Sequence, residues 1–261
     1  MRSLNNSLGR ISAFWLNEFR RMRADPGQFF VIVMLPVLMV AALTPMALAV
    51  LRMKGHANAN GAEQSVPGMV VLFSFTSTTI LGGAFFREHL WNTWERLRAS
   101  PALPFEIIVG KCGPVYVLSL CQLSVVWFVG ITAFHLKISG SLITIAILNG
   151  FLSWATLGIG MALVALCRTI DQIGIIGNMG SMVLGGLSGA FMPIDLHSGM
   201  GMVARCSPLF WALSAYQSVI FDGKGILDNT FTFLLLFGFG AAGFLIGLMR
   251  FRMSDTKIGS T

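Results

Sequence analysis

The stretch that decides the fold runs from Phe86 to Lys111 and reads FREHLWNTWERLRASPALPFEIIVGK. It is the most charged stretch of a chain that is otherwise almost entirely apolar, and it lies between two long hydrophobic runs. Proline tolerates the first turn of a helix and disfavours a helical residue before it. Pro101 and Pro104 therefore predict that one helix ends and another begins here, with a short surface helix connecting two membrane spans.

The composition indicates a polytopic membrane protein. Of the 261 residues, 55% are hydrophobic and only 11% are charged, whereas an average soluble domain has about 25% charged residues. The mean hydropathy is +0.75. A net charge of +7 could indicate a nucleic-acid partner. In so apolar a chain, however, basic residues more often flank membrane spans, and we expect no nucleic-acid partner.

Six hydrophobic runs are long enough to cross a bilayer. A helix rises about 1.5 Å per residue, so about 20 residues span the hydrocarbon core. The predicted fold is therefore an all-α membrane protein with six transmembrane helices. The predicted spans are residues 28–51, 66–86, 107–134, 142–167, 173–192 and 231–249.

The N-terminal residues predict an amphipathic helix and not a signal peptide, because the apolar run starts late and is long. One helical face is apolar and the basic residues fall elsewhere, which suits a helix lying at the membrane interface; an ordinary packed helix would show the same pattern. We expect three parts: an amphipathic helix (1–27), a six-span domain (28–250) and a polar tail (251–261). The apolar face consists of Leu8, Ile11, Trp15, Phe19 and Met22.

The distribution of charge predicts the orientation. Most of the 18 lysines and arginines flank the spans on the side that carries both termini. Basic residues accumulate in cytoplasmic connections. Both termini are therefore expected in the cytoplasm, together with residues 87–106 and 168–171.

The connection at 87–106 combines a tryptophan-bearing helical face with charges that point away from it. Tryptophan favours the headgroup level, so one face is expected on the membrane and the charged face, with Glu88, in the cytosol. Lys111 is expected to extend its ammonium group back to the interface. A solvated loop is the plain alternative. The apolar face consists of Leu90, Trp91, Trp94 and Leu97.

This stretch resembles the first cytoplasmic loop of ABC-2 type permeases, the membrane subunits of ATP-binding-cassette exporters. Asn92 stands where that family usually has glycine. The N-terminal helix is similar to the family's connecting helix, and residues 189–223 are similar to its short external helices between spans five and six. The matching elements are, in order, Glu88, Thr93-Trp94-Glu95, Pro101 and Glu106-Ile107…Gly110-Lys111.

The resemblance implies a division of labour. Two permease copies, identical or related, would form the pathway in the bacterial inner membrane among membrane lipids, and two copies of a separate ATPase would bind ATP and magnesium. The sequence contains no GxxxxGK[ST] motif, so no enzymatic activity and no cofactor are expected in this chain. The residues expected to couple to the ATPase are Glu88, Trp91, Trp94, Glu95, Arg96, Arg168 and Asp171.

In that family spans two and five line the pathway. Their uncharged aromatic and hydroxyl side chains suit an amphipathic or lipid-like cargo, such as a drug or natural product. Export of a polysaccharide or lipid-linked glycan is the alternative, and helix packing is the simpler role for the same residues. The expected lining residues are Phe73, Phe75, Thr76, Thr79, Asn178 and Ser181.

Two other classes of membrane protein fit less well. Residues 186–189 read GLSG, the GxSG nucleophile motif of rhomboid proteases, but the last predicted span contains no histidine to act as the base. A proton- or ion-coupled carrier would need a carboxylate within a span, and none is predicted there. The four cysteines and four histidines show no metal-ligand spacing.

Overall fold

The computed structural model describes residues 2–24, 26–53, 60–91, 93, 95–96, 99–100, 103–191 and 199–250. The regular structure of these residues is helical throughout, as predicted. The helices are α1 (Arg2–Ala24), α2 (Pro26–Met53), α3 (Ala62–Ser74), α4 (Thr76–Leu90), α6 (Pro104–Thr132), α7 (Leu142–Leu166), α8 (Ile170–Leu187), α9 (Gly199–Ala204), α10 (Pro208–Asp222), the 3-10 helix η1 (Leu227–Asn229) and α11 (Thr230–Arg250).

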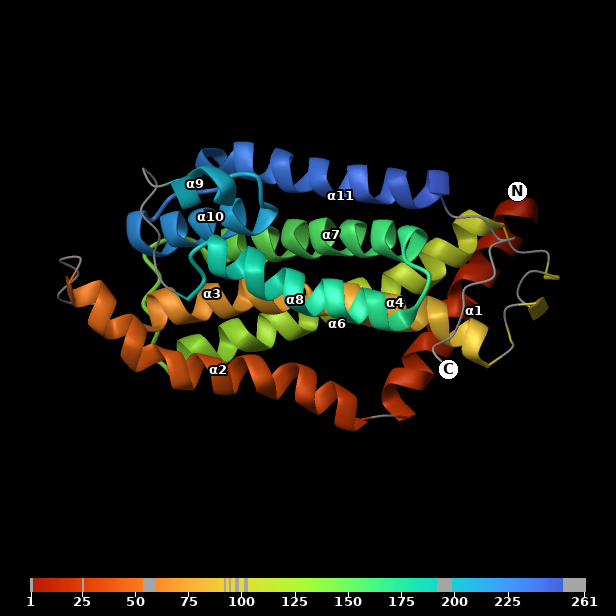
Figure 1. The fold of residues 1–261 in the computed structure, drawn as a ribbon, viewed down its shortest axis with the longest axis horizontal. Helices are drawn as coiled ribbons and strands as arrows, with labels where there is room; N and C mark the ends of the chain where they lie inside the picture. Colours follow the sequence, from red (N-terminus) through yellow and green to blue (C-terminus); the bar gives the residue numbers. More distant parts are fainter. Residues whose placement is uncertain are drawn as a thin grey trace.

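The long helices form an elongated bundle (Figure 1). Helices α6, α7, α8 and α11 run roughly along its long axis, and α2 slants along one side. Helix α1 crosses one end of the bundle, and α9 and α10 lie at the other end. Helix α4 ends and α6 begins at the α1 end, and α7 connects to α8 there as well (Figure 1). The two charged connections of the sequence therefore leave the bundle at the same end.

Within the described residues, five helices are long and apolar enough to cross a membrane. They correspond to the first four predicted spans and the sixth. The fifth predicted span corresponds to α8, which falls outside this set because Asp171, Gln172, Asn178 and several glycines lower its hydropathy. The five candidate spans are Phe30–Met53, Ala62–Glu88, Pro104–Thr132, Leu142–Leu166 and Leu227–Arg250.

The helices around the charged connection are longer than the predicted spans. Span two consists of α3 and α4, which a turn at Phe75 separates, and α4 continues to Leu90. Glu63, Glu88 and Glu106 consequently lie inside candidate spans, as does Asp228 at the start of the last one, each near an end. The prediction that no carboxylate lies within a span is therefore wrong, although the hydrocarbon centre is spared.

Close backbone contact holds α7 against α11. A Cβ atom on Gly158 would lie 2.3 Å from the carbonyl oxygen of Gly240, and one on Gly243 would lie 2.3 Å from the carbonyl carbon of Gly158. Only glycine permits this approach, which maximises van der Waals contact between helices in lipid. The edge of the Trp154 ring also packs on Gly240: a Cβ atom on Gly240 would lie 2.2 Å from Trp154 Cδ1.

The second end of the bundle contains the two short helices predicted within residues 189–223, α9 and α10. Helix α10 packs into the bundle, and Tyr216 is completely buried. Its hydroxyl donates to Asn149 Oδ1 of α7 at 2.6 Å, and Trp127 Nε1 of α6 donates to the same oxygen at 3.1 Å. Asn149 thus joins three helices, which is a packing role for a polar residue within a span.

Candidate functional site

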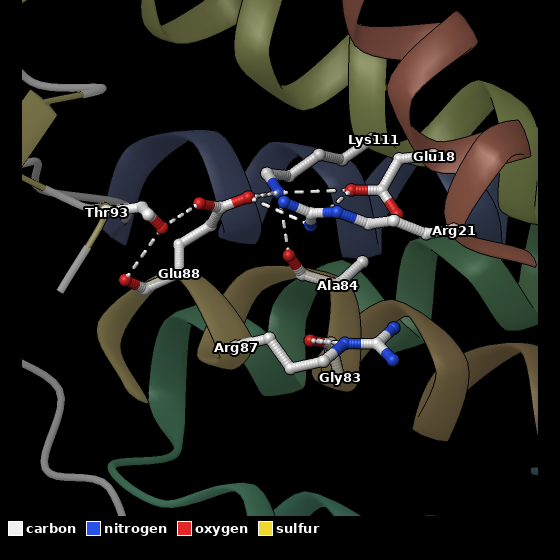
Figure 2. A network of polar contacts seen from close by, with 8 residues as sticks. All are labelled: Glu18, Arg21, Gly83, Ala84, Arg87, Glu88, Thr93 and Lys111. Atoms are coloured by element: carbon white, nitrogen blue, oxygen red, sulfur yellow. Dashed lines mark hydrogen bonds and ion pairs between the residues drawn. The ribbon is translucent and has the colours of Figure 1, made fainter. Parts of the chain in front are cut away.

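Four charged side chains from three helices meet at the α1 end of the bundle (Figure 2). Glu18 and Arg21 come from α1, Glu88 from the last turns of α4, and Lys111 from the second turn of α6. We call this set the ionic junction. It joins the N-terminal helix to both helices that flank the charged connection.

Lys111 occupies the centre of the ionic junction, with only 2% of its surface exposed. Its Nζ lies 2.9 Å from Glu88 Oε1 and 3.5 Å from Glu18 Oε1, and it donates to the carbonyl oxygen of Ala84 at 2.7 Å. Three acceptors match the three protons of an ammonium group. The prediction that Lys111 extends back to the interface is therefore wrong, because the fold supplies its partners internally.

Glu88 is also buried, with 7% of its surface exposed. Its carboxylate accepts from Lys111, from Arg21 Nη1 at 3.2 Å and from the Thr93 hydroxyl. Thr93 also donates to the backbone carbonyl of Glu88 (Figure 2). The expectation that Glu88 lies on an exposed charged face is wrong: α4 continues past it, so the side chain points at α6 and α1.

The charges of the ionic junction cancel. Two carboxylates face one ammonium and one guanidinium group, and Arg21 also lies 3.4 Å from Glu18 Oε1. Burying an unpaired charge costs several kcal/mol, whereas paired and hydrogen-bonded charges are tolerated. Removing any one member would leave an uncompensated buried charge. The arrangement therefore couples three helices, so that each depends on the other two for its charge partners.

A second ion pair fastens α1 to the start of α6. Arg10 Nε and Nη2 each lie 2.7 Å from an oxygen of Glu106 in a bidentate contact. Glu106 Oε2 also accepts from the backbone N–H of Leu103, which caps the helix. The sequence contains a signal for the cap, since Glu106 is the third residue of a helix that begins with Pro104. The sequence contains no signal that Glu106 pairs with Arg10, which lies 96 residues away.

Helix α1 rests directly on the backbone of α6. A Cβ on Gly110 would lie 2.6 Å from Phe14 Cβ, and one on Gly113 would lie 2.0 Å from the Trp15 ring. The Trp15 indole also donates to the carbonyl oxygen of Val109 at 3.3 Å. The prediction of an N-terminal helix is thus confirmed, and its apolar face packs in part against a span.

The other predicted coupling residues that the structure describes are exposed, unlike Glu88. Trp91 is 57% exposed, with the Arg21 guanidinium 5.3 Å from its ring centre. Glu95 and Arg96 are exposed, and Trp94 lies outside the described residues. Arg168 and Asp171 are exposed at the turn between α7 and α8. Their role in coupling stays a prediction; the two connections that carry them lie at the α1 end of the bundle (Figure 1).

The predicted lining residues do not form one surface within a single chain. Phe75 belongs to the hydrophobic core, and the buried Ser181 donates to the carbonyl oxygen of Asn178 in its own helix. Phe73 packs against the core, and Thr76 and Thr79 are partly buried. Asn178 is exposed on α8, where Ile175, Met179 and Met182 are exposed as well. A lining role for these residues stays a prediction.

Two features that the sequence raised for enzyme classes can be located in the structure. No three His, Cys, Asp or Glu side chains among them lie close enough together to hold a metal ion. Ser188 of the GxSG motif is buried, and its hydroxyl donates to the carbonyl oxygen of Leu184 in the same helix. The ionic junction can hold helices together and transmit displacement.

Comparison with known proteins identifies the family. The sequence profile described as "ABC-2 type transporter" matches residues 10–221. Over 191 residues the chain is 31% identical to the inner membrane transport permease YhhJ of Escherichia coli K12, which covers 70% of this chain and 50% of YhhJ. It is 26% identical over 205 residues to the linearmycin resistance permease protein LnrN of Bacillus subtilis, covering 76% of this chain and 52% of LnrN.

A third relative is the probable multidrug ABC transporter permease YbhR of Escherichia coli K12, at 26% identity over 133 residues, which cover 50% of this chain and 36% of YbhR. The chain spans about half the length of the first two relatives. The profile match includes α1 from residue 10 onward, the ionic junction, the spans as far as α8, and nearly all of α10. The chain therefore belongs to the ABC-2 type transporter family.

Proposed function

We propose that this chain is the membrane subunit of an ATP-binding-cassette exporter, and that it works as a dimer with two copies of a separate ATPase. Permeases of this family generally work with ATP-binding subunits, and the relatives named above are permeases. The observation that carries the proposal is the ionic junction, because it joins three helices at the end from which both charged connections emerge.

The ionic junction suggests how a displacement of the surface connection after α4 would be transmitted to the membrane-spanning helices. Trp91 is exposed and lies three residues after Glu88, with Arg21 against its ring. Thr93, two residues after Trp91, donates hydrogen bonds from its hydroxyl to the carboxylate and the backbone carbonyl of Glu88. A partner that displaced residues 91–96 would therefore move the end of α4, and the buried charge contacts would carry α1 and α6 with it.

The orientation proposed here places this end in the cytoplasm of a bacterium, at the inner membrane. The support is the excess of basic residues on that side and the description of YhhJ as an inner membrane permease. An ATPase pair in the cytoplasm would then meet Trp91, Glu95 and Arg96, and would meet the turn with Arg168 and Asp171 in parallel.

For the cargo we propose an amphipathic or lipid-like compound moved outward. Two relatives are described as a linearmycin resistance permease and a probable multidrug permease. A face of α8 exposes Asn178 among Ile175, Met179 and Met182, a mixture that suits an amphipathic surface between two copies of the chain. The glycan alternative would need a more polar lining than this face offers.

The test is reconstitution of the full chain with its candidate ATPase in proteoliposomes. We expect ATP-dependent transport of amphipathic antibiotics and dyes. Glu95→Lys should abolish transport and the stimulation of ATP hydrolysis, because it reverses an exposed charge in the connection that follows Glu88. The matched control is Asp222→Lys, an equivalent reversal at an exposed carboxylate at the other end of the bundle.

Each outcome has a distinct meaning. Equal transport by Glu95→Lys and Asp222→Lys would show that the surface at the α1 end does not receive the ATPase. Transport of a lipid-linked glycan but not of any amphipathic drug would overturn the proposed cargo and leave the coupling intact. Transport without an ATPase would overturn the proposed class.

A further inference from the structure

An apolar trough runs along the outside of the bundle between α6, α7 and α11. It consists of a cavity of about 530 Å³ and an adjoining cavity of about 250 Å³. Tyr116 and Trp154 line both cavities, so the two lie side by side along the same helices. A cavity of about 150 Å³ already suffices for benzene, and drug-sized ligands occupy roughly 300–1,000 Å³.

The trough extends along the helix axes for about the depth of one leaflet. Its lining on α7 reaches from Ile147 to Leu157, and its lining on α11 from Phe237 to Leu248. At about 1.5 Å per residue, ten or eleven residues correspond to roughly 15 Å, which is half of the roughly 30 Å hydrocarbon core. The end near Leu248 is the end at which α1 crosses the bundle.

The polar atoms of the lining side chains are bonded to backbone carbonyls. Trp15 Nε1 donates to Val109, Trp154 Nε1 donates to Phe237 at 3.3 Å, and the Tyr116 hydroxyl donates to Gly150 at 3.2 Å. Their rings therefore present apolar surface to the trough. Such a lining has no directed group for a polar ligand, but it suits a hydrocarbon chain.

One end of the trough has the features of a headgroup level. Trp15 lines the cavity nearer this end, seated on the bare backbone at Gly113, and tryptophan favours the boundary between hydrocarbon and headgroups. Arg250 ends α11 two residues beyond Leu248 and is exposed. An arginine at this level complements a phosphate.

We propose that the trough is a binding site for one acyl chain of a membrane phospholipid, from the leaflet that α1 faces, with its phosphate level with Trp15 and Arg250. This inference requires only that α6, α7 and α11 span the membrane, and it does not depend on the proposed exporter function. The bound chain would complete the packing between α6 and α11, which the protein leaves open beside Trp154.

The experiment is native mass spectrometry of the full chain. The protein would be released from membranes into detergent supplied with long-chain phosphatidylethanolamine and phosphatidylglycerol. We expect the wild type to retain one phospholipid per chain under collision conditions that remove loosely held lipid. Leu248→Trp, which places a larger ring in the trough at a half-exposed position, should lose it. The matched control is Leu245→Trp, on the same helix outside the trough, where the side chain is exposed.

A second measurement does not depend on mass spectrometry. Added long-chain phospholipid should raise the thermal unfolding midpoint of the wild type and of Leu245→Trp, but not of Leu248→Trp; short-chain phospholipid should raise none. Equal retention in all three proteins, or retention in none, would overturn the proposal. It would also be overturned if the retained mass were a non-lipid compound, detergent alone, or a second copy of the chain held through this face.

Discussion

Glu88→Gln is the most direct perturbation of the ionic junction. The substitution keeps the size of the side chain and removes one negative charge. Lys111, which is almost completely buried, then has Glu18 at 3.5 Å as its remaining carboxylate partner, and Arg21 competes for that same oxygen at 3.4 Å. The buried set would carry a net charge of +1 in place of zero.

The expected loss of stability is large for a single neutralisation. Breaking a buried ion pair by removing one partner costs about 3–5 kcal/mol. Because Glu18 remains near Lys111 and the Glu88 side chain is not fully buried, we expect the lower end, about 3 kcal/mol. For a chain of this size about 2–4 °C of midpoint correspond to each kcal/mol. The thermal unfolding midpoint should therefore fall by about 6–12 °C.

The assay is thermal unfolding of the purified full chain in detergent, followed by tryptophan fluorescence. The matched control is Arg87→Gln, one residue earlier, where Nε donates to the carbonyl oxygen of Gly83 and the side chain points away from the ionic junction (Figure 2). Losing that bond should cost about 1 kcal/mol or less. The double variant of Glu88→Gln with Lys111→Met should be more stable than the sum of the two single changes predicts, by about 2 kcal/mol.

The reasoning fails on either of two results. One is a Glu88→Gln midpoint within about 2 °C of the wild type, which corresponds to less than about 1 kcal/mol. The other is strict additivity of Glu88→Gln and Lys111→Met, which would mean that the two side chains do not interact in the folded protein.

Three further predictions concern packing, attachment and orientation. Gly158→Ala should lower the free energy of unfolding by about 1–3 kcal/mol, because the new Cβ would meet a backbone carbonyl of α11. Gly238→Ala is the control and should have no such effect, because no atom lies within 4 Å of its new Cβ. Equal unfolding midpoints of the two variants would refute this prediction. Glu106→Gln removes the bidentate ion pair with Arg10, so amide hydrogen exchange should speed up in α1. Unchanged exchange there would show that the pair does not hold the helix. Cys206 is exposed beyond α9, and a membrane-impermeant maleimide should label it from outside intact cells; labelling only after lysis would invert the proposed orientation.

Most of the fold follows from the sequence because a helix in lipid must satisfy its backbone internally. Length and apolarity alone therefore predicted five of the spans found. They could not predict the turn at Phe75 that divides the second span, since a helix break within an apolar run leaves no change in composition. The predicted fifth span, α8, is the least apolar of the six, because Asn178 and glycines alternate with apolar residues, and its position in the membrane stays a prediction.

The ionic junction was not predictable in the same way. A charge beside a span usually reaches water, so Glu88 and Lys111 were expected at the surface. Their burial depends on α4 continuing to Leu90 and on α1 lying across both helices, which are properties of the assembled fold. One signal was present: Glu18 is the only acidic residue of α1, in a helix with five arginines. The exposed coupling residues are different, because their proposed role depends on a partner chain.

The sequence separation within the ionic junction has a consequence for biogenesis. Lys111 follows Glu18 by 93 residues, and synthesis at about 5–20 residues per second separates their appearance by about 5–20 s. During this interval Glu18 has only Arg21 of its own helix as a partner from the ionic junction in α1, and α1 cannot yet make its contacts with α6. Glu88 can pair with Arg21 once α4 has emerged, and the emergence of α6 adds Lys111, which completes the charge balance of both acids. Complete docking of the N-terminal helix therefore follows synthesis of the third span.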